Sequence, residues 1–242
     1  MKRREVSPAA LPQIGHMLAG GFYAGRIFFD GAEYALIEAG REYECAAPWW
    51  DHSGPRPRIR GATNRFDGMA NTLAMSAEGC TIATKVLSMN VRGTWGWHIP
   101  SIEELQVIRA NLTQLEPWDH RMCAHAPQAF GHHQYWSSTQ KENAATAWLM
   151  GMYPWAIPDT NWVSKTAGIR PVKVMRIKAE AFIHAPHSDE PETVARNLSG
   201  LVACPAIEAV LERFVNEDAG RFYGRTDELV AELARIGAEQ RT

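Results

Sequence analysis

Side chains of the types that bind metal ions are concentrated between residues 119 and 133. Zinc is commonly held by four histidine, cysteine or carboxylate ligands, so this stretch could support a metal-dependent enzyme. The spacing matches no standard zinc motif, however, and the stretch has the composition of a loop between a helix and a strand. Exposed or locally hydrogen-bonded histidines are the favoured interpretation, and we expect no cofactor. The cluster consists of His120, Cys123, His125, His132 and His133.

Other kinds of catalysis have less support in the sequence. The four cysteines lack the glycine-rich turn or other local signature of a nucleophilic thiol, and their wide spacing indicates free thiols in a reducing compartment. Glu103 and Glu104 are adjacent carboxylates, but neighbouring residues diverge by ~100° around a helix and do not face each other. The sequence therefore predicts a protein that is not an enzyme and has no catalytic residues.

Arginine and tryptophan are concentrated in the segment 49–60. Arg56, Arg58 and Arg60 alternate with other residues, so an extended backbone would direct all three side chains to one face. Trp49 and Trp50 lie close by in the sequence, and arginines beside aromatic rings can bind anionic or sugar ligands. The alternative is a solvated face, or a contact with an acidic neighbour.

An apolar, proline-containing segment occupies residues 152–162. Its two prolines disfavour a regular helix or a central strand, yet it contains three aromatic residues. Such a loop either folds back onto the core or forms a contact surface, and both interpretations stay open. If it is a contact surface, Tyr153, Trp155 and Trp162 are the expected anchors, because aromatic residues dominate the energetics of interfaces.

Local patterns predict the elements that must position these residues. Asp30-Gly31 separates two β-branched and aromatic runs, as in a hairpin with a type I′ turn, and Ser101 and Glu104 have capping-box spacing. A long loop is expected over 41–64. The first hairpin and the last strand are expected to share a sheet, and the segregation of helices from strands predicts an α+β fold. The predicted strands are 22–29, 33–39, 135–138, 146–150 and 169–177, and the predicted helices are 67–78, 81–89 and one that begins at Ser101.

The composition is that of an ordinary globular chain. It has 242 residues and a formal net charge of -2, so no overall field draws it to nucleic acid or to an anionic membrane. No stretch approaches the ~20 apolar residues of a membrane-spanning helix. The basic start of the chain imitates a signal peptide, but Ser7 and Pro8 interrupt the apolar run that should follow. We expect no nucleic-acid partner, no membrane insertion and no signal peptide.

Four blocks of sequence occur in an order typical of one known family. They are FDGMANT at 66–72, GWHIPSIEEL at 96–105, YWSST at 135–139 and IRPVKV at 169–174. The chain thereby resembles the domain-of-unknown-function family related to the lectin-like C-terminal domain of bacterial collagen-like adhesins. The resemblance implies a C-type-lectin-like fold, a mixed sheet with flanking helices, related in shape to formylglycine-generating enzymes and phage tropism proteins.

Composition also predicts how the chain is divided. All nine tryptophans lie between residues 49 and 162, and a polar segment with two prolines follows near residue 185. We expect an N-terminal extension (1–19), a lectin-like body (20–180), a linker (181–191) and a helical appendage (192–242). The apolar stripes of the appendage are expected to pack on the body or on a partner. They include Ile207, Leu211, Phe214 and Val215 in the first helix and Leu229 and Leu233 in the second.

The function expected from the resemblance is binding, since the family includes adhesins, glycan-binding proteins and phage virion proteins. The missing export signal favours a phage virion protein assembled in the host cytoplasm and released by lysis. Its expected partners are other virion proteins or further copies of itself, contacted through the loops and the C-terminal helices. The alternative is a receptor-binding module that recognises a host surface glycan or protein through Tyr153, Trp155, Trp162 and the arginine segment.

Overall fold

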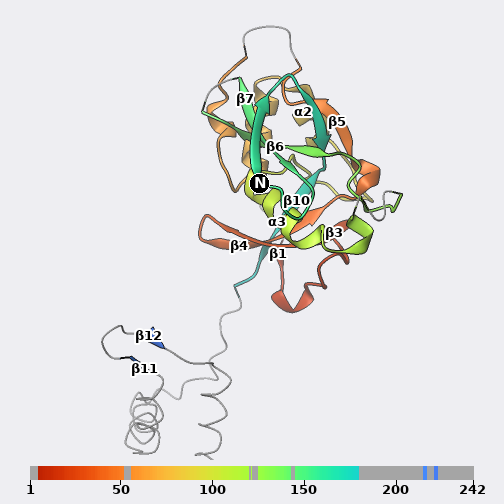
Figure 1. Ribbon diagram of the computed structural model, residues 1–242, viewed down its shortest axis with the longest axis vertical. Coiled ribbons are helices and arrows are strands. Elements are labelled where there is room, and N and C mark those ends of the chain that lie inside the picture. The colour runs from red at the N-terminus through yellow and green to blue at the C-terminus, as the bar shows by residue number, and fades with distance from the viewer. Residues whose placement is uncertain are drawn as a thin grey trace, which may run out of the picture. The chain divides into compact units, whose positions relative to one another are not determined.

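The computed structural model describes residues 5–51, 56–119, 121, 125–142 and 145–179, and the backbone of two short strands at 215–216 and 221–222 (Figure 1). The chain divides into two compact units, Met1–Glu180 and Ala181–Thr242. In its described residues the first unit contains three α-helices and two five-stranded sheets, so the predicted α+β class is confirmed. None of the helices in the described ranges is long and apolar enough to cross a membrane.

The first sheet joins the two ends of the first unit. Its strand order is β1-β10-β4-β3-β2, with β1 parallel to β10 and the other neighbours antiparallel. Asp30 and Gly31 have φ angles of 48° and 69°, as the predicted type I′ hairpin between β3 and β4 requires. The shared sheet of the first hairpin and the last strand is confirmed. The strands are β1 (Glu5–Val6), β2 (Met17–Leu18), β3 (Gly21–Phe29), β4 (Ala32–Glu38) and β10 (Val172–Ile177).

The second sheet has the order β5-β9-β6-β7-β8, in which only β6 and β9 are parallel. Both of its edge strands, β5 and β8, lie in segments that were predicted to be loops. The 41–64 segment contains β5, and the 152–162 segment ends in β8, where Pro158 is tolerated as the first residue of an edge strand. The strands are β5 (Cys45–Pro48), β6 (Gln134–Gln140), β7 (Thr146–Gly151), β8 (Pro158–Trp162) and β9 (Thr166–Ile169).

The helices begin where the sequence predicts. Asp67 caps α1 by accepting a hydrogen bond from the Ala70 N–H at 3.0 Å. At α3, Ser101 Oγ accepts from the Glu104 N–H at 3.2 Å while Glu104 Oε2 accepts from the Ser101 N–H at 2.6 Å, which is the predicted capping box. The α-helices are α1 (Gly68–Ala77), α2 (Thr81–Leu87) and α3 (Ile102–Leu112), and short 3-10 helices cover Pro8–Ala10, Arg41–Tyr43, Arg60–Ala62 and Glu116–Trp118.

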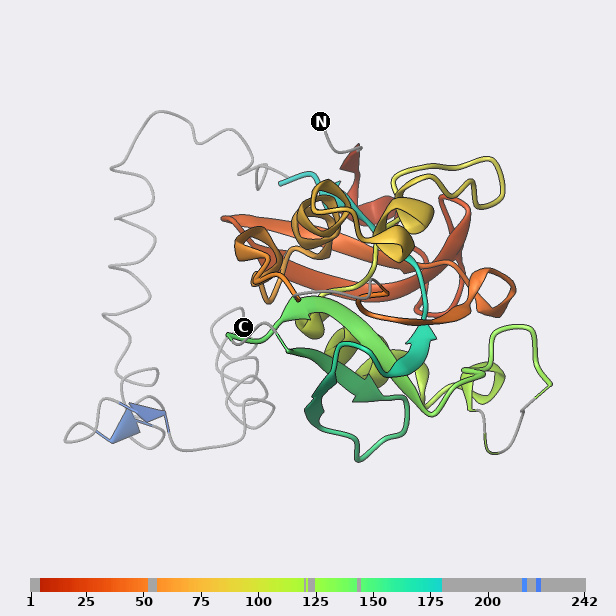
Figure 2. The same ribbon diagram turned by 90° about the horizontal axis from the view of Figure 1, so that it is seen from above.

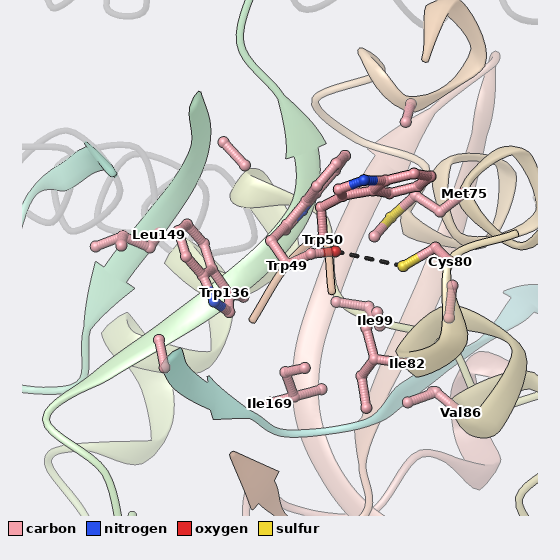
Figure 3. Packing of buried hydrophobic residues seen from close by; sticks show 14 of the residues in the cluster. Trp49, Trp50, Met75, Cys80, Ile82, Val86, Ile99, Trp136, Leu149 and Ile169 are labelled. Atoms are coloured by element: carbon pink, nitrogen blue, oxygen red, sulfur yellow. Dashed lines mark hydrogen bonds between the residues drawn. The ribbon is translucent and has the colours of Figure 1, made fainter. Parts of the chain in front are cut away.

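The core consists of two main apolar clusters. One packs α1 and α2 against the second sheet around Trp49, Trp97 and Trp136, all of them buried (Figure 3). The other surrounds α3, which contacts β3 of the first sheet and β6 and β7 of the second (Figure 2). Trp97 and Ile99, from the sequence block at 96–105, both belong to the first cluster.

The ends of the chain differ from expectation in two places. The 1–19 segment, expected as an extension, contributes β1 and β2 to the first sheet because their backbones pair with β10 and β3. Val215, assigned from the sequence to a helix, lies in β11 (Val215–Asn216), which pairs with β12 (Arg221–Phe222). The other residues named in the predicted C-terminal helices lie outside the described residues: Ile207, Leu211, Phe214, Leu229 and Leu233.

Candidate interaction surface

The connection between β7 and β8 presents large apolar side chains to solvent. Trp155 is 68% exposed and Ile157 is 77% exposed, whereas Met152 and Ala156 are buried and Tyr153 is half-buried. Both interpretations that the sequence left open therefore apply, since Met152 and Ala156 anchor the segment to the core and the exposed side chains form a surface. We call the side chains of Tyr153, Trp155 and Ile157 the aromatic surface.

Contacts from other elements hold the aromatic surface in place. The guanidinium of Arg109, on α3, donates a hydrogen bond to the Pro154 carbonyl at 2.5 Å. The Arg121 guanidinium lies 5.2 Å from the centre of the Trp155 ring, within cation–π range. The rings of Tyr153 and Trp155 are 5.3 Å apart. A surface fixed in this way loses little conformational entropy when it binds a partner.

Trp162 lies apart from the other two predicted anchors. It ends β8, whereas Trp155 precedes β8, and a five-residue strand separates its ends by roughly 13 Å. Trp162 is 59% exposed and pairs with Thr146, and Trp148 pairs with Thr160, so both tryptophans share one face of the β7–β8 ribbon. Of the three predicted anchors, Tyr153 and Trp155 therefore lie together, and Trp162 lies at the other end of β8.

Trp49 and Trp50 belong to the core and not to a ligand site. They follow β5, which carries them inward, and their side chains are only 1% and 8% exposed. Trp49 Nε1 donates to the Ser137 carbonyl at 2.8 Å, and the Trp49 carbonyl accepts from the Cys80 thiol at 3.3 Å (Figure 3). Neither ring can stack on a ligand at the surface, which corrects the predicted role.

The arginine segment is extended at Ile59, but Arg60 begins a 3-10 helix. Arg56, Arg58 and Arg60 are exposed, whereas Ile59 is only 2% exposed. The side chain of Gln140, at the end of β6, fixes the backbone on both sides of Arg58. Its Oε1 accepts from the Ile59 N–H at 2.7 Å and its Nε2 donates to the Pro57 carbonyl at 3.0 Å. The three arginines are therefore exposed as a group, but the helical start at Arg60 interrupts the alternation on which the predicted shared face depends, and the two tryptophans predicted beside them are buried.

The histidine stretch is only partly described, because His120 and Cys123 lie outside the described residues. His132 Nε2 lies 3.3 Å from Glu44 Oε1, and the His133 ring lies 6.0 Å from that of Tyr153. Within the described ranges, no three or more histidine, cysteine or acidic side chains form a group suited to a metal ion. The favoured interpretation was that these histidines are exposed or bonded within the protein. His125 and His133 are exposed, and His132 lies beside Glu44.

Sequence reasoning missed a buried network around Arg170. Its Nη1 lies 3.1 Å from Glu38 Oε2 and its Nη2 lies 2.7 Å from Glu44 Oε2. Tyr135 donates to the same Glu44 oxygen at 2.8 Å, and Trp118 Nε1 donates to Glu38 Oε1 at 3.0 Å. One signal in the sequence was available: Glu38 and Arg170 are opposite charges, each placed at the end of an apolar strand-forming run.

The network fixes a loop, and Arg170 and Tyr135 within it both stay protonated near neutral pH. Arg170 donates to the carbonyls of Gln128 and Ala129, and the Gly131 N–H donates to Glu44, so the segment that leads to His133 is tied to both sheets. Burial acts to lower the pKa of Arg170, but the two carboxylates outweigh it and the pKa is raised. Burial also raises the pKa of Tyr135. Arg170 therefore stays charged and Tyr135 neutral near pH 7.

Comparisons with known proteins identify no relative, since no protein-family profile and no curated protein matches the chain. Two exposed regions stand out among the described residues. One is the aromatic surface. The other lies at the opposite end of β8, where Trp162 and the arginine segment are exposed. Both present side chain types that are frequent at binding interfaces.

Proposed function

We propose that this protein is a non-enzymatic structural protein of a phage virion and that its aromatic surface binds another virion protein. One observation above all supports this: a largely exposed tryptophan, Trp155, is held in a fixed loop by Arg109 and Arg121. Rigid aromatic anchors with an arginine beside them are typical of interface hot spots. The assignment to a virion depends on the resemblance in sequence, and copies of the protein are expected to meet through the C-terminal apolar stripes.

We also propose that the body is a C-type-lectin-like scaffold. The four sequence blocks support this, as does a first sheet in which β1 lies beside β10 near the end of the body. The Arg170 network supports a role without catalysis, because its charged groups bond to one another and to the backbone. A group engaged in this way has no free position for a substrate proton.

Mass spectrometry of purified particles tests the proposal. We expect the protein in the particle, and we expect Trp155→Ala to lower its incorporation about tenfold or more, as loss of a hot spot does. Trp95→Ala is the matched control, since Trp95 is 61% exposed and lies outside the aromatic surface. Absence of the protein from particles would refute the virion role. Equal incorporation of the two variants would refute the role of the aromatic surface.

A second candidate function is recognition of a host surface glycan or protein. A specific observation favours it: the arginine segment lies near the end of β8 that carries the exposed Trp162. Arg56 Nη2 donates a hydrogen bond to Ser164 Oγ there, at 3.2 Å. Arginine beside tryptophan is a combination that binds anionic and sugar groups.

A further inference from the structure

Basic and aromatic side chains gather at one corner of the second sheet. The corner is formed where the arginine segment, the end of β6 and the end of β8 meet. We call it the basic corner, and we define it by Arg56, Arg58, Arg60, Lys141, Trp148 and Trp162.

Hydrogen bonds bring these three segments together. Gln140 binds the backbone on both sides of Arg58, and the next residue, Lys141, donates its N–H to the Thr146 carbonyl at 3.1 Å. Thr146 is the residue opposite Trp162 in the β7–β8 pairing. The bond from Arg56 to Ser164 closes the group, because Ser164 lies two residues after Trp162. The corner is therefore built from segments joined by hydrogen bonds that span 81, 83 and 108 residues of the sequence.

Two cationic side chains lie close to the ring of Trp148. The Arg65 guanidinium lies 5.2 Å from its ring centre and the Lys141 ammonium lies 5.5 Å away. Arg65 is in turn held by Glu103 at 2.7 Å. Trp148 is half-buried, and its diagonal neighbour Trp162 is 59% exposed on the same face of the ribbon. Trp162 is therefore an exposed aromatic residue diagonal to Trp148, and two cations lie at the ring of Trp148.

The charge of the corner differs from that of the protein. The whole chain has a net charge of -2. Among the described residues, however, no ion pair involves Arg56, Arg58 or Arg60, whose side chains are exposed. The three arginines lie within residues 56–60, so three exposed positive charges are close together along the chain. Several neighbouring charges suit a linear polymer with repeated anionic groups better than they suit a single small anion.

We propose that the basic corner binds an anionic glycan, a chain of sugars bearing carboxylate or phosphate groups. Arginine binds either group through paired N–H donors, and the face of Trp162 can pack on the apolar face of a sugar ring. Binding to nucleic acid relies on a broad positive field, whereas the positive charge described here is confined to one corner of the second sheet. This inference rests on the second candidate function and is independent of the aromatic surface.

Binding of the full-length protein to immobilised polymers tests the proposal. The probes are polygalacturonate, which carries carboxylates, phosphomannan, which carries phosphates, and uncharged dextran. We expect binding to at least one charged glycan, weakening as salt is raised, and no binding to dextran. The comparison of the two charged polymers identifies the anionic group.

Variants assign the binding to the corner. The triple variant Arg56→Ala/Arg58→Ala/Arg60→Ala should bind the glycan at least about tenfold more weakly, because tenfold corresponds to a loss of only about 1.4 kcal/mol. Trp162→Ala should weaken glycan binding but not binding to polyglutamate, a polyanion without sugar rings. Trp155→Ala is the control and should bind as the wild type does. Arg58→Glu, a single exposed change, repeats the test if the triple variant or Trp162→Ala proves unfolded by circular dichroism.

Several results would overturn the proposal. They are no binding to either charged glycan, unchanged binding by the folded arginine variants, and binding to polyglutamate or duplex DNA that is as tight as binding to the glycan. Failure here is distinguishable from failure of the virion role. Incorporation into particles depends on Trp155, so a triple variant that loses glycan binding should still be incorporated.

Discussion

Arg170 is the residue at which a single substitution should destabilise the body most clearly. Glu38 is fully buried and Glu44 is 5% exposed at its side chain, and Arg170 is the cation that both contact. Arg170→Met keeps much of the side chain volume but leaves the two carboxylates without this cation. Breaking a buried ion pair in this way costs about 3–5 kcal/mol, so we expect a loss of that size in the free energy of unfolding measured with urea.

Arg26→Met is the matched control for that experiment. Arg26 pairs with Glu33 at 3.2 Å, but both side chains are more than 40% exposed. An exposed pair contributes only about 0.2–1 kcal/mol. If the two variants lose the same stability, the Arg170 network does not stabilise the body as its geometry indicates.

Burial also predicts how stability depends on pH. It raises the pKa of the Cys80 thiol above its ordinary value of 9.0 and that of Tyr135 above 10.0. Both groups ionise more readily in the unfolded chain, so their contribution to stability is complete below pH 9 and is lost as the pH rises through the folded-state values. Urea unfolding between pH 8 and about 11 should therefore show falling stability.

Cys80→Ala serves as the control for the alkaline effect. Burial raises the pKa of the Cys45 thiol as well, so Cys80→Ala removes one of three such groups in the described part of the chain. The fall in stability above pH 9 should become less steep while the part due to Tyr135 and Cys45 is retained. The comparison uses the slope of the free energy of unfolding against pH, because the substitution also changes packing and so shifts the stability at every pH. Stability that stays constant or rises over this range would contradict the prediction.

At the scale of elements, the edge strand β8 is protected against pairing with another chain. The backbone N–H of Thr160 is bonded to Asp159 Oδ1 at 2.7 Å and that of Trp162 to Asn161 Oδ1 at 2.9 Å. Pro158 has no N–H to offer. Unprotected edge donors promote association between sheets. We expect the double variant Asp159→Val/Asn161→Val to self-associate more than the wild type as concentration is raised, measured by light scattering.

Thr160→Val is the control for β8, since it adds a β-branched apolar residue to the same strand but keeps both protective side chains. It should scatter light as the wild type does. A double variant that behaves like this control would show that Asp159 and Asn161 do not protect the edge.

The elements also show what a sequence can and cannot predict. The β3–β4 turn and the start of α3 were predicted correctly, because Asp30-Gly31 and the Ser101–Glu104 pair act within a few residues. The burial of Trp49 could not be read in this way. It depends on the pairing of β5 with β9, about 120 residues further along the chain, and β5 itself is a four-residue strand without alternation.

The candidate site shows the same limit. The exposure of Trp155 in a proline-containing loop was among the alternatives that composition predicted. The arginines are exposed, but the alternation that predicted their common face ends at Arg60, where a 3-10 helix begins. The separation of Trp162 from Trp155 was missed, because an edge strand formed where a loop was expected. The Arg170 network was missed because its members are 126 and 132 residues apart.

At the scale of the whole molecule, the first unit should fold without the second. The described buried apolar residues run from Val6 to Ile177, so its core is complete before residue 180. We expect a chain of residues 1–180 to unfold in urea at the same midpoint as the full chain, within about 10–15% in extrapolated stability. A chain of residues 1–165 is the control and should not fold, because it lacks β9 and β10. An unfolded 1–180 chain would refute the independence of the first unit.

The place of β10 between β1 and β4 has a consequence for biosynthesis. The β3–β4 hairpin leaves the ribosome early, but its neighbour β10 ends at residue 177 and emerges only when most of the body has been translated. One edge of β4 therefore waits unpaired while more than a hundred residues are added, at a few to about twenty residues per second. The nascent hairpin is thus the part of the molecule with the greatest need of a chaperone.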